Sequence, residues 1–370
     1  MSENPDKVHF RFFNSKLLCL TLLIGIGASC RQSEKSFAEI IVHTFPIEKH
    51  LDASNLDIPI SIKRLGIADS LLVITNDEDP YKIHIFNPLN NNLLTSFGRI
   101  GKGPNEFILE PLYYNQFQYD KDGLNLWLFD RNSRLLRLFN LNSIRANDEK
   151  AIKKSVLLSG GHVYSELSVY YISDSCIVGS SNISYGQFFI FNPIKDTIDY
   201  FNYFPREKTS KNEVKRETIN NYFAGTGRLN PSGSKIAVAY LFFNRIDVFD
   251  IHEKRLLSIR NPSEGENQIS DKHDISSFAD NKFGYYSLYC SEKYIYALKN
   301  DCTRNNFTSG NYTSEIQVFD WSGLPICRYF LSHPIEFLVV DEKHKILYGG
   351  HYYTDGTISK FELGSELFEN

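Results

Sequence analysis

The sequence lacks an excess of charge of either sign and lacks an apolar run long enough to cross a membrane. Its 40 lysines and arginines nearly balance its 44 aspartates and glutamates, and the formal net charge is −4. This balance argues against nucleic acid as a partner, because nucleic-acid-binding domains carry a basic patch or stripe. An uncharged apolar run over residues 17–28 has twelve residues, whereas a membrane-spanning helix needs about 20.

Signature sequences of common enzymes are also missing. No His-Glu-x-x-His or Gly-x-Ser-x-Gly pattern occurs, and the cysteine spacings match no zinc site. We therefore expect no metal and no cofactor, and no catalytic residue is assigned. Cysteines inside strand-like runs are usually small buried hydrophobes, but a disulfide between Cys290 and Cys302 stays open as an alternative in an oxidising compartment.

The composition is that of an ordinary globular protein. Methionine occurs once and tryptophan twice, but there are 28 phenylalanines and 22 tyrosines. This composition excludes disorder, collagen and coiled coil. Flat, bulky side chains suit the half-buried faces of β-sheets, so we interpret the aromatic content first as core.

The amino terminus has the features of a targeting segment. Three cations precede the run over 17–28, and this order is typical of a secretory signal peptide. The small residues Gly27-Ala28-Ser29 before Cys30 resemble a lipobox, where bacterial lipoproteins are cleaved and lipidated, although Gly27 stands where leucine is usual. We predict a signal peptide over 1–29, lipidation of Cys30 and a short tether over 30–36. Release as a soluble secreted protein is the alternative.

The residues after Cys30 bear on the location. Arg31 is not the aspartate that marks retention in the inner membrane of some bacteria, and residues 31–35 contain only one acid, Glu34, whereas acids at this place are associated with surface export. We therefore predict an outer-membrane lipoprotein that faces the periplasm and is held at the membrane by its acyl chains.

One pattern recurs six times in the rest of the chain. It is an alternating apolar run that ends in phenylalanine and a turn residue, and the copies lie 42 to 70 residues apart. A second apolar run precedes each copy, and further strand-like runs flank the pair. The recurring residues, which we call the marker phenylalanines, are Phe86, Phe139, Phe191, Phe249, Phe319 and Phe361.

Four strands in each of six units predict an all-β fold, a six-bladed β-propeller with four-stranded antiparallel blades over residues 37–370. A ring of blades must close, because an open ring leaves strand edges unpaired. Residues 37–45 read as a strand ahead of the first unit. We predict that this N-terminal strand of the mature chain completes the last blade and that the protein is a monomer.

A glycine-rich segment between the first two units is the most specific motif. With the strand pattern that follows, it resembles one repeat of the NHL propellers, and the whole mature chain resembles the TolB-like six-bladed propeller lipoproteins of Bacteroidota. The resemblance covers most of the mature chain in architecture, but only residues 97–140 match in motif. It implies a lipid-anchored propeller without an assigned activity. The residues that carry it are Gly98, Arg99, Gly101, Gly103, Pro104, Glu106 and Phe107.

The same glycines invite a second interpretation as a phosphate cradle, because they permit positive φ beside two cations. No Lys-Ser or Lys-Thr pair follows, and no helix pattern supplies an N-terminal dipole. We interpret the segment as a structural turn between blades in which Glu106 caps or pairs locally.

Two hypotheses for the function follow. The first is a binding or scaffolding module for a protein or glycan in the cell envelope, engaged through long loops over 261–283 and 300–315 and through exposed members of the tyrosine pairs at 113–114, 285–286 and 352–353. The second is a lyase or hydrolase whose site lies at the channel mouth, built from acids or histidines of several blades. Fold alone does not choose between them.

Overall fold

The computed structural model describes residues 37–58, 60–148, 150–159, 166–181, 186–201, 203, 223–262, 282–300, 302–308, 312–351 and 357–368. Residues 1–36, which include the predicted signal peptide, Cys30 and the tether, lie outside this part of the chain. Strands dominate the described residues. The helices among them are α2 (Leu141–Arg145), α4 (Arg304–Thr308) and the 3-10 turn η3 (Ser365–Leu367). All of these are too short to form a transmembrane span.

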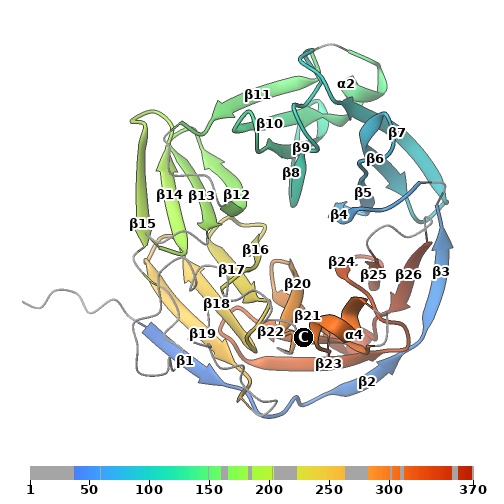
Figure 1. Cartoon of the computed structure of the whole chain (residues 1–370), viewed down its shortest axis with the longest axis vertical. Helices are drawn as coiled ribbons and strands as arrows, with labels where there is room; N and C mark the ends of the chain where they lie inside the picture. Colours follow the sequence, from blue (N-terminus) through green and yellow to red (C-terminus); the bar gives the residue numbers. More distant parts are fainter. Residues whose placement is uncertain are drawn as a thin grey trace, which may run out of the picture. The chain divides into compact units, whose positions relative to one another are not determined.

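Six β-sheets, the blades, are arranged in a ring (Figure 1). Each blade begins with its strand nearest the ring centre. Blade 1 contains β4 (Arg64–Ala68), β5 (Leu71–Thr75), β6 (Tyr81–Asn87) and β7 (Asn92–Arg99); blade 2 contains β8 (Leu112–Asp120), β9 (Gly123–Asp130), β10 (Leu135–Asn140) and β11 (Ile152–Leu157); blade 3 contains β12 (Glu166–Ser173), β13 (Cys176–Ser181), β14 (Phe188–Asn192) and β15 (Thr197–Phe201).

The other three blades include strands from the N-terminal part of the propeller. Blade 4 contains β16 (Gly225–Leu229), β17 (Lys235–Tyr240), β18 (Arg245–Asp250), β19 (Arg255–Arg260) and β1 (Phe37–Ile41); blade 5 contains β20 (Tyr285–Cys290), β21 (Tyr294–Asn300), β22 (Ser314–Asp320), β23 (Pro325–Leu331) and β2 (Glu48–Leu51); blade 6 contains β24 (Phe337–Asp341), β25 (Ile346–Gly350), β26 (Thr357–Glu362) and β3 (Ala53–Asp57). The predicted all-β six-bladed propeller is thus confirmed.

The marker phenylalanines mark the same place in every blade. Each lies in the third strand and is at most 2% exposed. Each also stands directly opposite an aliphatic residue of the second strand, so one cross-strand pair recurs around the ring. The six partners, in chain order, are Leu72, Leu126, Ile177, Ile236, Ile295 and Leu347.

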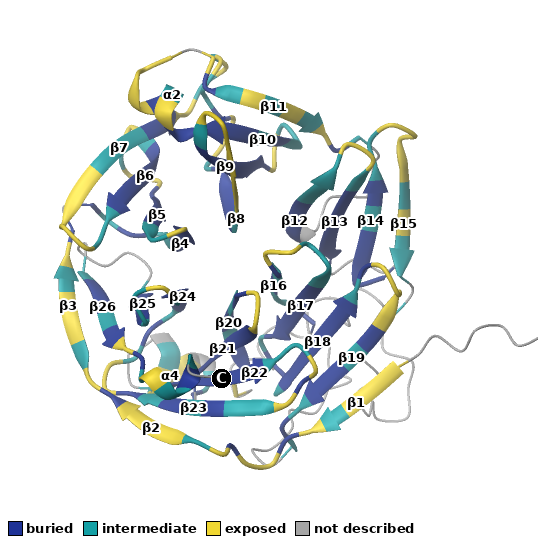
Figure 2. Cartoon of the chain, turned by 180° about the vertical axis from the view of Figure 1, so that it is seen from behind, coloured by how far each residue is buried: buried dark blue, intermediate teal, exposed yellow. Residues whose placement is uncertain are grey.

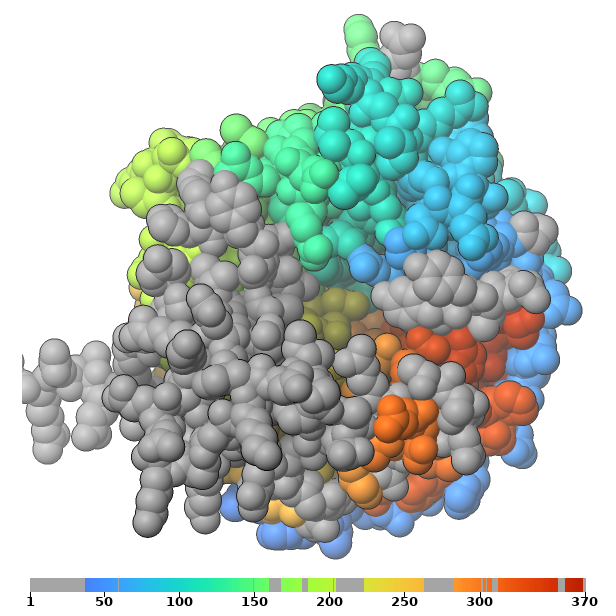
Figure 3. All heavy atoms as spheres, viewed as in Figure 1, coloured from blue at the N-terminus to red at the C-terminus, as the bar shows by residue number. Residues whose placement is uncertain are grey.

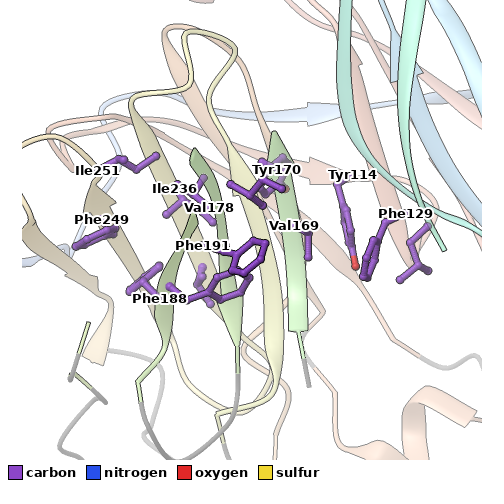
Figure 4. Packing of buried hydrophobic residues seen from close by; sticks show 14 of the residues in the cluster. Tyr114, Phe129, Val169, Tyr170, Val178, Phe188, Phe191, Ile236, Phe249 and Ile251 are labelled. Atoms are coloured by element: carbon purple, nitrogen blue, oxygen red, sulfur yellow. The ribbon is translucent and has the colours of Figure 1, made fainter. Parts of the chain in front are cut away.

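The core lies between the blades. Side chains of blades 2, 3 and 4 form one buried cluster, part of which is drawn in Figure 4. Within it, the rings of Phe188 and Phe249 from neighbouring blades stack with centroids 5.0 Å apart. The second and third strands of each blade are mostly buried, and exposed residues concentrate on the perimeter, in the turns and in the second half of β8 (Figure 2). No blade therefore has a complete core of its own.

The N-terminal part of the propeller closes the ring, but the closing strand differs from the predicted one. Residues 37–45 do not join blade 6; β1 lies at the outer edge of blade 4. Strand β3 pairs with β26 instead, with Leu56 opposite Ile358. The segment over 37–45 is placed by its apolar side chains, because Val42 and Phe45 are buried between blades 4 and 5. Only one large apolar residue occurs in β3, so its role was not visible as an alternating pattern.

A bulge in β8 joins three blades at the ring centre. The register shifts between Tyr113 and Phe117, and the extra residues carry two amides. Asn115 accepts a hydrogen bond from the backbone of Ile67 in blade 1 at 3.0 Å. Gln116 bonds both the N–H and the C=O of Tyr171 in blade 3, at 3.0 and 2.6 Å. The innermost strands of blades 1 and 3 have no further strand beside them at the ring centre. The amides of Asn115 and Gln116 bond backbone groups on these edges that a further strand would otherwise bond.

The two faces of the ring differ in their connections. The first four strands of each blade are antiparallel to their neighbours, whereas β2 is added parallel to β23. The turns from second to third strands and the links between blades therefore share one face, which we call the long-loop face. The strand ends joined by residues 100–111, 202–224, 261–284 and 301–313 lie on this face. Connections on the opposite face have two to five residues, apart from 141–151, which contains α2.

Ring closure can be tested with two truncated chains. A chain that begins at Asp52 loses β1 and β2 but keeps β3, so it should unfold in one cooperative transition at a lowered temperature. A chain that begins at Ile58 also loses β3 and exposes the edge of β26, and we expect it to self-associate and to lose the cooperative transition. Circular dichroism and size-exclusion chromatography measure both. Equal behaviour of the two chains would contradict the role of β3.

Candidate functional site

A cavity of about 510 Å³ opens on the long-loop face at blade 5. This volume lies within the range of ligand pockets, roughly 300–1,000 Å³. Residues from four strands and two connections line it, so its parts are distant in sequence. The lining residues are His50, Lys282, Lys299, Thr313, Ser314, Glu315, Arg328, Phe330 and Leu331.

The cavity lies along a row of side chains that crosses blade 5. Lys299 stands opposite Glu315, Glu315 opposite Phe330, and Phe330 opposite His50. Directly opposite residues share one face of a sheet. The His50 and Phe330 rings stack with centroids 5.1 Å apart, and the Arg328 guanidinium lies 4.7 Å from the centre of the Phe330 ring. The row therefore places aromatic, basic and acidic groups side by side.

Glu315 is held by two donors, Gln317 of its own strand β22 and Arg328 of the neighbouring strand β23. Its Oε1 accepts from Gln317 Nε2 at 2.6 Å, and its Oε2 accepts from Arg328 Nε at 2.8 Å. Gln317 in turn accepts from the hydroxyl of buried Tyr285 at 2.7 Å. Fully bonded buried networks of this kind are rigid, so one wall of the cavity has a fixed arrangement of polar groups.

The same positions form a polar layer in other blades, and this layer is what the sequence reasoning missed. The residue two places before the marker phenylalanine is His84, Arg137, Phe189, Asp247, Gln317 and Ser359 in blades 1 to 6. Five of these six are polar, and the four in blades 1, 4, 5 and 6 are at most 8% exposed. Aligning the six copies on the marker phenylalanines would have shown the layer.

In blade 4 the layer is a buried ion pair. Asp247, with no exposed surface, accepts from Arg245 Nε at 2.8 Å, from the Tyr240 hydroxyl at 2.6 Å and from Ser258 Oγ at 2.7 Å. Burial alone would lower the pKa of Arg245, but the charge and hydrogen bond of Asp247 together with Tyr240 and Tyr203 outweigh burial, and the pKa is raised. The Tyr240 hydroxyl also contacts Gln187 Oε1, so its single hydrogen has two possible acceptors.

In blade 1 the layer contains a buried histidine. His84 is 4% exposed, and its Nδ1 lies 2.8 Å from Ser96 Oγ. Its Nε2 has no hydrogen-bond partner and lies 3.6 Å from Asp79 Oδ2. Burial and the charge of nearby Lys82 lower the pKa of His84 against the opposing effect of Asp79. The imidazole is therefore neutral at pH 7.

The glycine-rich segment forms a tight connection from β7 to β8. Phe107 N–H donates to the Arg99 carbonyl and Gly101 N–H to the Phe107 carbonyl, both at 2.9 Å. Glu106 accepts from Gly103 N–H at 2.6 Å. Phe107 is completely buried against Phe139, with centroids 5.5 Å apart.

The other residues of this segment serve the same connection. Gly98 has φ +78°, and a Cβ there would lie 2.8 Å from the Phe107 ring. The Arg99 guanidinium donates to the Tyr81 hydroxyl at 2.8 Å and lies over its ring. Pro104 is exposed, and Arg137 donates to the Glu106 carbonyl at 2.7 Å.

The tyrosine pairs and cysteines are mostly interior. Tyr113, Tyr114 and Tyr285 are at most 9% exposed, while Tyr286 is half-buried. The pair at 352–353 and most of the loop over 261–283 lie outside the described residues. Burial raises the pKa of the Cys176, Cys290 and Cys327 thiols, which disfavours the nucleophilic thiolate. Cys290 and Cys302 are thiols and do not form a disulfide.

The charged and polar groups do not gather into a recognisable metal site. Within the described ranges, no three histidines, cysteines, aspartates or glutamates lie close enough together to hold a metal ion. What the described residues do bring together is the cavity of blade 5 and the polar layer beneath the long-loop face.

Comparison with known proteins agrees with this architecture. The family model described as TolB-like 6-blade propeller-like matches residues 36–343, which confirms the predicted resemblance to TolB-like six-bladed propellers. No curated protein matches the chain in sequence. A solved structure of a DUF4221 family member from Bacteroides vulgatus superposes with TM-score 0.54 at 12% identity, over 84% of this chain and 97% of that one. A protein of Bacteroides fragilis named as exported superposes with TM-score 0.50 at 12% identity, over 88% and 99%.

The contact between Gly98 and Phe107 predicts a measurable cost. Gly98→Ala should lower the free energy of unfolding by about 2–5 kcal/mol, because it adds left-handed strain to overpacking against a buried ring. Gly233→Ala is the matched control: its φ is +74°, but its Cβ would approach Ile172 only to 3.3 Å, so about 1–2 kcal/mol is expected. Urea denaturation measures both losses. Equal losses would mean that the Phe107 contact contributes nothing.

The buried histidine predicts a pH dependence of stability. The pKa of His84 is lowered in the folded protein, whereas an unfolded histidine has a pKa of about 6.5. As the pH falls through 6.5, the unfolded chain takes up the proton first and stability decreases. His84→Gln should reduce the difference between the urea midpoints at pH 7.5 and pH 5.5. The exposed His252→Gln control should leave it as in the unmodified protein, and a His84→Gln result equal to this control would refute the prediction.

Proposed function

The chain belongs to the TolB-like six-bladed propeller family, and we propose that it is a lipid-anchored binding or scaffolding module of the cell envelope that holds a protein or glycan at its long-loop face. The observation that carries this proposal is the difference between the two faces. From β3 to β26, every connection longer than five residues, apart from 141–151, joins strand ends on the long-loop face. Loops held by a rigid scaffold are where binding residues concentrate.

The cavity of blade 5 gives this face a specific place for a ligand. Its wall combines the ring of Phe330, the hydroxyls of Thr313 and Ser314 and the ion pair between Glu315 and Arg328. A concave site with apolar surface and a few fixed polar groups is the usual form of a small-molecule or sugar pocket. The same groups would equally take the side chains of a protein partner.

The proposed anchor and location rest on the N-terminal segment. The small residues before Cys30 and the charged, then apolar, stretch ahead of them support export and lipidation. The similar fold in a Bacteroides protein named as exported is consistent with an envelope location. The outer membrane and its periplasmic face follow from the residues after Cys30.

A pull-down from native envelope tests the binding role. The mature chain should retain a specific protein or glycan, and Thr313→Trp, which places a large ring at the exposed rim of the cavity, should reduce retention at least tenfold. Leu324→Trp, at a 56% exposed site in a turn of the opposite face, is the control and should retain the partner fully. Retention of nothing specific, together with stoichiometric metal in the purified protein, would overturn the proposal in favour of the hydrolase or lyase alternative.

A further inference from the structure

Three aliphatic side chains are exposed on the connection between β7 and β8. Ile100 is 48% exposed, Ile108 39% and Leu109 52%. The two backbone segments that carry them lie side by side, because Ile100 forms a parallel bridge with Phe107, the residue before Ile108. We call these three residues the aliphatic patch. Single exposed aliphatics need no explanation, but three together in one connection do.

The backbone holds the aliphatic patch outward. The hydrogen bonds between Arg99, Gly101 and Phe107 fix the two segments that carry it, and Ile108 N–H donates to Asp130 Oδ2 at 3.0 Å. The fully buried Phe107 fills the space beneath. The aliphatic side chains therefore cannot turn into the core without breaking these bonds. In Figure 3, which looks onto the long-loop face, the blue and cyan atoms of this region lie in open view at the upper right.

The charge next to the aliphatic patch is positive. Arg99 and Lys102 are exposed on the same connection. Its two acids are engaged elsewhere: Glu106 accepts from Gly103 N–H, and Glu110 pairs with Lys63 at 2.7 Å and accepts from Thr75 at 2.9 Å. The outward surface of the connection is therefore aliphatic and cationic.

We propose that this connection rests on an anionic lipid bilayer. The aliphatic patch enters the boundary between headgroups and acyl chains, and Arg99 and Lys102 lie among lipid phosphates, which is how amphipathic segments bind membrane surfaces. The aliphatic side chains thus match the acyl-chain region of the bilayer, and the two cations match the phosphate region.

The proposed lipid anchor, on which this step rests, makes even a weak contact effective. The seven residue steps from Cys30 to Phe37 span at most about 25 Å, so the propeller stays near the bilayer and the contact becomes intramolecular. Blades 2 and 5 lie across the ring from each other (Figure 1). A contact at the blade 2 side leaves the cavity of blade 5 accessible to a partner.

Fluorescence of Leu109→Trp tests the contact without removing the apolar group. The mature chain from Arg31, made without acylation, keeps every described strand. Mixed with vesicles of seven parts phosphatidylethanolamine and three parts phosphatidylglycerol, this variant should show a blue shift that vesicles of phosphatidylcholine alone do not produce. Leu324→Trp on the opposite face is the control and should show none. A shift in both variants, or in neither, would overturn the proposal.

Vesicle sedimentation of a second pair of variants checks the same contact. The Ile108→Asp, Leu109→Asp double variant should sediment at least tenfold less than the unmodified chain, while Ile194→Asp, at a 73% exposed site on the opposite face, should sediment equally. If the double variant loses a pulled-down protein and the unmodified chain does not bind vesicles, the patch is a protein docking surface and the membrane contact is refuted. Mass spectrometry of Cys30 in protein from native envelope tests the anchor separately, because vesicle binding of the unacylated chain does not depend on it.

Discussion

The structure depends on covering both faces of every blade. Each buried cluster is shared by neighbouring blades, so a single blade has no complete core and would expose an apolar face in isolation. The ring covers both apolar faces of all six blades only if the last blade packs against the first. The pairing of β3 with β26 makes this happen, and it joins residues about 300 positions apart. The strands β1 and β2 then extend the same N-terminal segment along blades 4 and 5 and bind it to the perimeter.

Residues at different positions along each strand have different roles in the ring. The marker phenylalanines and their aliphatic partners hold neighbouring blades together, so their size is constrained by packing. Two residues away, toward the long-loop face, the polar layer begins. The short turns of the opposite face fix the register of each hairpin, whereas the links on the long-loop face can change in length without moving the strands. Changes in sequence that alter function are therefore expected mainly on the long-loop face.

The sequence predicts the elements whose signal is local and repeated. The marker phenylalanines gave the number of blades and the strands around them, because alternation is a property of neighbouring residues. The closing strand could not be found in this way, since Ala53–Asp57 has one large apolar residue and is placed by its partner in β26. The apolar segment over 37–45 was more conspicuous, but its Val42 and Phe45 fill the space between blades 4 and 5.

The candidate site is harder to predict for the same reason. Its residues come from β2, β21, β22 and β23 and from the two connections that carry Lys282 and Thr313, and nothing in their local sequence says that they meet. The exposed tyrosine that exists among the described residues, Tyr119 at 60%, was not in a predicted pair, whereas Tyr113 and Tyr114 are buried. Pairing of adjacent aromatics does not tell which of them the neighbouring blade covers.

The comparison of blades 4 and 5 indicates how this fold acquires a binding site. Counted from the marker phenylalanines, Tyr240 and Lys299 are equivalent, as are Arg245 and Glu315. In blade 4 Arg245 and Tyr240 both donate to the buried Asp247. In blade 5 the same positions line a cavity, and the row continues through Phe330 to His50 of the added strand β2. The marker phenylalanines, which pack neighbouring blades together, lie two residues from the polar layer. Residues of the polar layer can therefore change without disturbing this packing, and such changes turn a structural contact into a recognition surface.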